Sequence, residues 1–164
     1  MAVPRLLANP VVRRLAVTLT LSAAGLAGLS TQEGGAIRKV YADPVGIATV
    51  CTGSVTKLPV GTVVSQDYCA ELLRKDTTTA QAAVKRLVKV PISQNQYDAL
   101  VDFTFNEGEG TLGKSELLRQ INAGHCKEAG ALFGKYNTAK GVVLRGLTNR
   151  RDWEASLWTP DCAE

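Results

Sequence analysis

A stretch of eighteen residues without a charged side chain, Leu15 to Gln32, constrains this 164-residue chain more than any other feature. It follows directly on Arg13 and Arg14, and basic residues ahead of an apolar run are typical of secretory signals and first membrane segments. As a helix the stretch would reach about 27 Å, slightly less than the roughly 30 Å hydrocarbon core of a bilayer. Threonines, serines and glycines interrupt its leucines and alanines, so residence in lipid should be only marginally favourable. We predict an export or signal-anchor segment over residues 1–30 and a folded domain over residues 31–164.

Three fates of this segment are compatible with the sequence. Ser22-Ala23-Ala24 and Gly25-Leu26-Ala27 both fit a small-x-small cleavage pattern, so removal is one of them. Retention as a weakly held anchor is the second, and burial as the first helix of a cytoplasmic protein is the third. The double arginine ahead of the apolar run favours export over burial.

Composition excludes several classes of protein. Hydrophobic residues make up 45% of the chain and charged residues 21%, which is ordinary for a soluble domain and excludes wholesale disorder. The net charge of +4 does not indicate nucleic-acid binding. When the three arginines of the first thirty residues are set aside, sixteen basic residues face fifteen acidic ones, and no run of Lys or Arg resembles a nucleic-acid arm.

Four cysteines agree with export. Cys51, Cys69, Cys126 and Cys162 form no C-x-x-C pair, and the single His125 cannot complete a zinc set with them, so we expect no metal site. In an oxidising compartment they would form two disulfides, for which three pairings are possible. Proximity along the chain favours Cys51–Cys69 and Cys126–Cys162, and four buried free thiols remain the alternative.

The remaining patterns predict an α+β protein that is mainly α-helical. Val40 to Thr52 resembles a β-hairpin around the turn Asp43-Pro44-Val45-Gly46. Ser65 is a good N-cap for a helix, which Lys75–Thr79 could break in two, and Ser93 to Gln96 is a capping box. Further helices are predicted over Ser115–Asn122, His125–Tyr136 and within Leu144–Leu157.

Glu33, Asp43 and Thr49 are the candidate catalytic residues. Two carboxylates from different elements can face one cleft in different environments, and acid/base chemistry needs that asymmetry. Glycosidic cleavage uses such a pair, and a gap wide enough for one water gives an inverting reaction. On spacing alone, solvated surface carboxylates are the competing interpretation, and Asp43 could simply accept backbone N–H bonds as the first residue of its turn.

Four motifs, in order, resemble those of phage-type lysozymes, glycoside hydrolase family twenty-four. Glu33-Gly34 followed by Tyr41 to Gly53 is similar to the family's E-G…Y-x-D-x-x-G-x-x-T-x-x-x-G signature. The other three are Ser93–Leu100 with Phe103–Gly108, similar to Q-x-x-A-L…F-x-F-N-x-G; Ser115–Leu118, similar to S-T-L-L; and Gly146–Glu154, similar to G-L-x-x-R-R-x-x-E. The resemblance covers about Glu33 to Trp158.

The resemblance implies a lysozyme fold with a small β-hairpin lobe and a helical lobe, joined by a long helix within Ser65–Val88. It also implies hydrolysis of the β-1,4 bond between N-acetylmuramic acid and N-acetylglucosamine in peptidoglycan, without a cofactor. Carried over by position, Glu33 would be the general acid. Asp43 would stabilise positive charge on the sugar or help to activate water, and Thr49 would hold that water.

Two further residues, Tyr41 and Asn106, would line the cleft and bind substrate. Arg150 and Arg151 would tie the last helix to the body of the protein through hydrogen bonds. The sequence departs from the family pattern in two ways. The loop from Gly35 to Ala42 is one residue longer than usual, and Ala48 and Ser54 occupy positions where many members have Trp and His.

The uncharged segment directly ahead of Glu33 resembles that of signal-anchor-release endolysins. It implies insertion through the Sec machinery, an inactive form tethered to the inner membrane in the host periplasm, and later release that lyses the host cell. Two other functions remain open. A lytic transglycosylase would break the same bond with a lone Glu and form an anhydro sugar, and a non-catalytic wall-binding protein could use the same scaffold.

Overall fold

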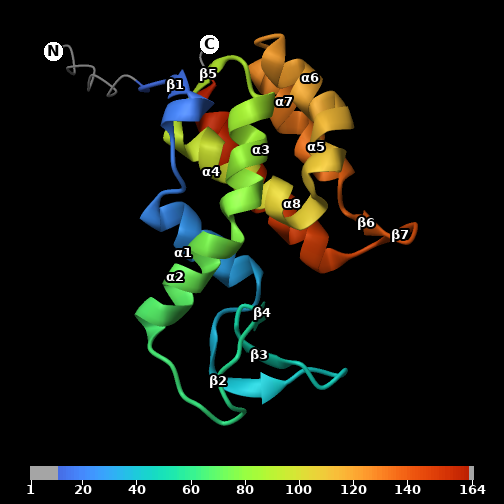
Figure 1. Ribbon diagram of the computed structural model, residues 1–164. Coiled ribbons are helices and arrows are strands. Elements are labelled where there is room, and N and C mark those ends of the chain that lie inside the picture. Colours follow the sequence, from blue (N-terminus) through green and yellow to red (C-terminus); the bar gives the residue numbers. More distant parts are fainter. Residues whose placement is uncertain (1–10, 163–164) are drawn as a thin grey trace, which may run out of the picture.

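The computed structural model describes residues 11–162 and divides them into a small lobe with a three-stranded sheet and a larger helical lobe (Figure 1). Residues 1–10 of the predicted export segment, and the last two residues, lie outside the described part. The elements in chain order are β1 (Arg14–Leu15), η1 (Ala16–Thr18), α1 (Ala23–Gln32), β2 (Ile37–Ala42), β3 (Ala48–Cys51), β4 (Ser54–Val55), α2 (Gln66–Asp76), α3 (Thr78–Leu87), β5 (Pro91–Ile92), α4 (Gln94–Glu107), α5 (Glu109–Lys114), α6 (Glu116–Asn122), α7 (Cys126–Leu132), η2 (Phe133–Lys135), β6 (Thr138–Ala139), β7 (Val142–Val143), α8 (Arg145–Trp158) and η3 (Thr159–Asp161). The predicted α+β, mainly α class is confirmed.

The uncharged segment is folded into the protein in this structure. Ala16 and Leu19 are buried in the core of the helical lobe. Ser22 caps α1 by accepting a hydrogen bond from the Gly25 amide, and Leu29 of α1 is fully buried. The segment therefore contributes to two buried clusters, the core of the helical lobe and the cluster of Leu26, Leu29 and Leu73. Within residues 11–162, no helix combines the length and apolar character that a membrane crossing requires.

Two consecutive helices, α2 and α3, connect the lobes. The predicted N-cap at Ser65 is confirmed, because its side chain accepts a hydrogen bond from the Tyr68 amide. The break predicted as possible falls at Thr77, which is fully buried. Its hydroxyl donates to the Arg74 carbonyl at 2.8 Å and accepts from Gln81 Nε2 at 3.1 Å. The resemblance implied one long helix, and the structure has two that meet at this buried threonine.

The small lobe is an antiparallel sheet in the order β2–β3–β4, with the predicted turn between its first two strands. The Gly46 amide donates to the Asp43 carbonyl at 2.9 Å, and Gly46 has a φ of 84°, which favours glycine. The register places Ile37 opposite Cys51 but Tyr41 opposite Thr49, so β2 is irregular between these pairs. The loop that is one residue longer than the family pattern includes this irregular stretch.

Each lobe contains one disulfide, with the pairing that chain proximity favours. Cys51–Cys69 joins β3 to α2, and Cys126–Cys162 joins the start of α7 to the C-terminal end of the described chain. The small lobe has a core of its own, in which Val40 and Val50 pack with the first disulfide. Half of that fully buried core is the disulfide itself.

The helical lobe is built around α4, which begins with the predicted capping box of Ser93 and Gln96. Sequence periodicity predicts one apolar face on this helix, but every residue from Gln96 to Thr104 is buried. Asp98 and Asp102 are therefore buried as well. An α-helix covered on all sides must satisfy such side chains with specific partners.

Sequence patterns did not indicate the β6–β7 hairpin. We predicted a helix up to Tyr136 with no strand after it, whereas α7 ends at Leu132 and η2 follows. The hairpin then pairs Thr138 with Val143, and it projects from the body of the molecule just before α8 (Figure 1).

Candidate active site

Glu33 lies at the junction of the two lobes. It caps the C-terminus of α1, where its amide donates to the Leu29 carbonyl at 3.0 Å. Gly34 and Gly35 follow with φ values of 84° and 81°, and these conformations turn the chain out of the helix toward β2. The Glu33 side chain is 25% exposed, and its Oε1 lies 2.7 Å from Arg150 Nη1. The carboxylate is thus reachable from solvent but held in one direction.

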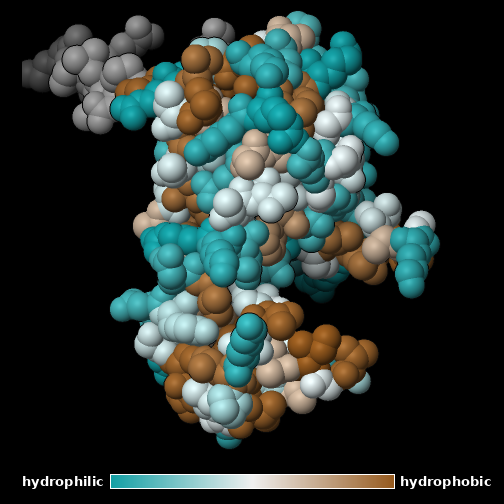
Figure 2. Space-filling view, viewed as in Figure 1, coloured by the Kyte–Doolittle hydropathy of each residue, from teal (hydrophilic) through white to brown (hydrophobic). Residues whose placement is uncertain are grey.

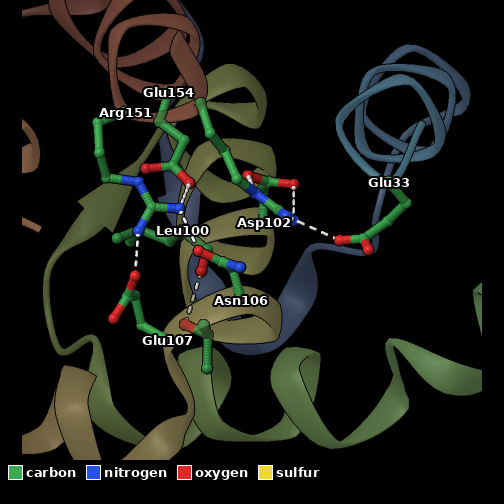
Figure 3. A network of polar contacts seen from close by, with 9 residues as sticks. Glu33, Leu100, Asp102, Asn106, Glu107, Arg151 and Glu154 are labelled. Carbon is green, nitrogen blue, oxygen red and sulfur yellow. Dashed lines mark hydrogen bonds and ion pairs between the residues drawn. The ribbon is translucent and has the colours of Figure 1, made fainter. Parts of the chain in front are cut away.

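Asp102, which is labelled in Figure 3, positions Arg150. Its Nε and Nη2 both donate to the Asp102 carboxylate at 2.8 Å, in the two-pronged geometry that fits a guanidinium to a carboxylate. Asp102 and Arg150 are 1% and 6% exposed, so the pair is fixed within the protein, and Nη1 is left to contact Glu33. Burial lowers the pKa of the Arg150 guanidinium, but the bonds to Asp102 and Glu33 outweigh burial and raise it overall. The charge of Arg150 therefore stays in place beside Glu33.

Arg151 anchors a second, neighbouring network. It is fully buried, and its guanidinium lies 5.0 Å from the centre of the Phe103 ring. Nη1 donates to Glu107 at 2.8 Å, while Nη2 donates to Asn106 Oδ1 at 3.0 Å and to Glu154 at 2.7 Å. The exposed Asn106, a predicted substrate-binding residue, is thus held by α8 (Figure 3). Arg150 and Arg151 tie the last helix to α4, as the sequence predicted.

Burial favours the protonated form of the Glu154 carboxyl. Burial, followed by the neighbouring Asp102 carboxylate, raises the pKa of Glu154 to about 10. Four carboxyl groups share two guanidinium groups across the two networks, so a proton on one of them reduces the excess of negative charge. Its Oε2 and the Nε of Arg151 have no hydrogen-bond partner in the described part of the chain.

The predicted residues of the small lobe are grouped on β2, β3 and the turn between them. Asp43 Oδ1 accepts from the amides of Val45 and Ile47 at 2.9 and 2.8 Å, so Asp43 stabilises its turn, and neither bond uses Oδ2. Thr49 is 5% exposed, and its hydroxyl donates to the Ile47 carbonyl at 3.0 Å. Tyr41 is the cross-strand partner of Thr49, so the two side chains share one face of the sheet.

This arrangement provides two carboxylates in different surroundings. Glu33 is paired with a buried guanidinium at the edge of the helical lobe, whereas Asp43 is fixed by backbone amides on the hairpin. Such a difference suits one acid and one base in the cleavage of a glycosidic bond. Within residues 11–162, no cluster of His, Cys, Asp and Glu is arranged to hold a metal ion.

Sequence reasoning missed the partners of Glu33. Asp102 lies within an apolar helical stretch, and an acid among buried positions is a signal for a buried ion pair. A cavity of about 450 Å³ lies between α1, α2 and residues of the small lobe. Leu26, Leu73, Arg38 and Arg74 are among its lining residues, and none of Glu33, Asp43 and Thr49 is.

Comparison with known proteins assigns the family. The Phage lysozyme family matches residues 31–154. The SAR-endolysin of Escherichia phage Mu is 36% identical over 118 residues, which cover 72% of this chain and 69% of that protein. The endolysin of Acyrthosiphon pisum secondary endosymbiont phage 1 is 34% identical over 142 residues, covering 84% of this chain and 97% of that one. A match to the endolysin of Bacillus phage B103, 41% identical over 96 residues, covers 58% of this chain and 36% of that protein, so this chain spans about a third of that relative's length.

Solved structures agree in fold. The crystal structure of a point mutant of P22 lysozyme has a TM-score of 0.79 at 31% identity and covers 87% of this chain and 99% of that one. The muramidase domain of SpmX from Asticaccaulis excentricus has a TM-score of 0.74 at 33% identity and covers 85% of this chain and 97% of that one. The chain is therefore a member of the phage lysozyme family, a family of glycoside hydrolases.

Proposed function

We propose that this protein is an endolysin that hydrolyses the β-1,4 bond between N-acetylmuramic acid and N-acetylglucosamine in peptidoglycan. The observation that carries the proposal is the position of Glu33, at the junction of the lobes and oriented by a buried Arg150–Asp102 pair. The endolysin names of the relatives and the muramidase domain among the structural neighbours support it.

In this mechanism Glu33 protonates the leaving glycosidic oxygen as the bond breaks. Asp43 stabilises the positive charge that develops on the sugar or takes a proton from the attacking water. Thr49 is suited to hold that water, because its own proton is engaged by the Ile47 carbonyl and its oxygen remains able to accept a hydrogen bond. Asn106, held by Arg151, presents an amide to the glycan.

The substitution Glu33→Gln tests the assignment. It keeps the size of the side chain and removes the transferable proton, so we expect loss of clearing of permeabilised Gram-negative cells with little change in thermal stability. Glu71→Gln is the matched control, since the Glu71 side chain is 79% exposed on α2 and should be dispensable. Equal clearing by both variants would refute the role of Glu33.

The products distinguish the alternatives. Mass spectrometry of the released muropeptides should show hydrated reducing ends. Anhydromuramic ends would assign a lytic transglycosylase instead. Binding to purified sacculi with no released product from the wild-type chain would assign a non-catalytic wall-binding protein.

We further propose that the N-terminal segment first tethers the protein to the inner membrane after Sec export and then leaves the bilayer. The uncharged run and the relatives named SAR-endolysin support this proposal. In the folded state α1 contributes Leu26 and Leu29 to the core and places Glu33 at its end. While the run lies in lipid those contacts cannot form, so the site is incomplete.

N-terminal sequencing of the membrane-bound and soluble forms tests the tether. Both should keep the full N-terminus. A soluble form that begins at Gly25 or Gly28 would show ordinary signal cleavage and would contradict release of the intact segment.

A further inference from the structure

The side chains of the β6–β7 hairpin are largely exposed in the described part of the molecule. Thr138, Ala139, Val142 and Val143 are all exposed, so neither face of the hairpin is buried. Val142 and Val143 are each 61% exposed, and Leu144, which follows them, is 43% exposed. A two-stranded hairpin with no packed face is marginally stable in water. Its aliphatic side chains therefore indicate a surface that is completed by something else.

The turn of the hairpin has a lysine, Lys140, at a position whose backbone conformation is unfavourable for lysine. Lys140 and Gly141 have φ values of 50° and 78°, and positive φ at both central positions is the geometry for which Asn-Gly is preferred. A lysine at the first position is strained there, because its Cβ crowds the backbone. The sequence keeps a cation at this point where an asparagine would form the turn more easily.

The surrounding stretch is basic and free of acids. Between Glu128 and Asp152 the chain has five basic residues and no Asp or Glu, although residues 31–164 as a whole are nearly neutral. Three of the five, Lys135, Lys140 and Arg145, are exposed and take part in no ion pair within residues 11–162. In Figure 2 this projection, at the right of the view, carries hydrophobic and hydrophilic side chains next to each other.

We propose that the β6–β7 hairpin docks the protein on an anionic lipid bilayer, with Val142 and Val143 entering the headgroup region and Lys135, Lys140 and Arg145 facing lipid phosphates. Aliphatic side chains beside cations are the combination that binds the interface of an anionic membrane. Valine offers a sugar neither a hydrogen bond nor an aromatic face, so a glycan fits this tip less well. The contact is separate from the N-terminal segment and does not depend on the catalytic roles proposed above.

Vesicle co-sedimentation with the full-length chain tests the proposal. We expect Val142→Ser/Val143→Ser to weaken partitioning onto vesicles of phosphatidylethanolamine and phosphatidylglycerol by about tenfold or more. The matched control is Val60→Ser/Val63→Ser, which removes two valines that are 61% and 69% exposed on the small lobe. All variants keep the N-terminal segment, so its contribution cancels. Equal partitioning by the two double variants would overturn the proposal.

Lys140→Asn separates docking from hairpin stability. It improves the turn and removes the charge, so we expect about fivefold weaker partitioning onto anionic vesicles and no change on phosphatidylcholine vesicles. Lys127→Asn, on the exposed face of α7, is the charge-matched control. No loss with Lys140→Asn relative to this control would contradict the proposal. A loss of binding to sacculi with no loss on vesicles, measured in the Glu33→Gln background to prevent digestion, would assign the hairpin to the wall instead.

Discussion

Removing the Cys51–Cys69 disulfide should unfold the small lobe while the helical lobe remains folded. The bond closes a loop of 18 residues, for which loop-closure entropy corresponds to about 3 kcal/mol. The small lobe cannot easily absorb this loss, because its fully buried core consists of Val40, Val50 and the two cysteines. The helical lobe has a separate and much larger core. We therefore expect the cost to fall on local opening of the lobe that holds Asp43.

Amide hydrogen exchange of Cys51→Ala/Cys69→Ala measures this opening lobe by lobe. In the small lobe, the Val40 amide donates to the Thr62 carbonyl at 2.9 Å. Because about 3 kcal/mol corresponds to a factor of roughly 150, this amide should exchange roughly 150-fold faster than in the wild type. The Leu100 amide in α4 should keep its protection. Clearing of permeabilised cells should fall in parallel with protection at Val40.

A control variant lacking the other disulfide sharpens the test. Cys126→Ala/Cys162→Ala opens a 36-residue loop that lies entirely within the helical lobe. It should lower protection in α4 and leave the Val40 amide unchanged. If either variant changes exchange equally in both lobes, the lobes do not open independently and the reasoning fails.

Two further predictions concern the buried side of α8 and α1. The folded state keeps a proton on Glu154 that the unfolded state releases, because burial and Asp102 raise its pKa from 4.5 to about 10, so stability falls as pH rises through this window. Because glutamine does not titrate, the free energy of unfolding of Glu154→Gln in urea should rise by about 1–3 kcal/mol relative to that of the wild type between about pH 6 and pH 8. Parallel pH profiles of the two proteins would contradict this. A Cβ on Gly28 would lie 2.1 Å from Cζ2 of Trp153, so Gly28→Ala should lower the melting temperature by about 4–8 °C, corresponding to roughly 2 kcal/mol. Gly113→Ala, whose Cβ would meet its nearest neighbour at 3.9 Å, should leave it unchanged or raise it, and equal losses in both variants would show that crowding by Trp153 is not the cause.

The features that could be predicted from the sequence are those with local causes. Ser65 and the capping box of Ser93 and Gln96 bind amides within one turn, so their residue types were enough to place two helix starts. The turn at Asp43 and the disulfide pairing followed from short separations in the chain. The candidate catalytic residues were found through motif spacing, and their roles stay predictions.

The features that could not be predicted depend on distant partners or weak local signals. Asp102 and Glu33 are joined only through Arg150, which lies 48 residues beyond the first and 117 beyond the second. The β6–β7 hairpin escaped notice because its strands have two residues each and both faces are exposed, so no alternation of apolar and polar residues marks it. The turn was also missed because Lys140 precedes Gly141, whereas Asn-Gly is the sequence that indicates a two-residue hairpin turn.

Gly25 and Gly28 of α1 affect both the packing of the folded protein and the affinity of the same segment for lipid. Side chains at Gly25 and Gly28 would collide with Asp98 and Trp153, so the folded enzyme requires these positions to stay bare. Because glycine has no side chain, each of these positions also lacks an apolar group that would favour transfer of the helix from water into lipid. Leucine at either glycine would increase the affinity of the segment for lipid, but it would also clash with Asp98 or Trp153 in the folded protein. If the segment first lies in the membrane, as proposed, its low affinity for lipid and its close packing in the folded protein both depend on these two glycines.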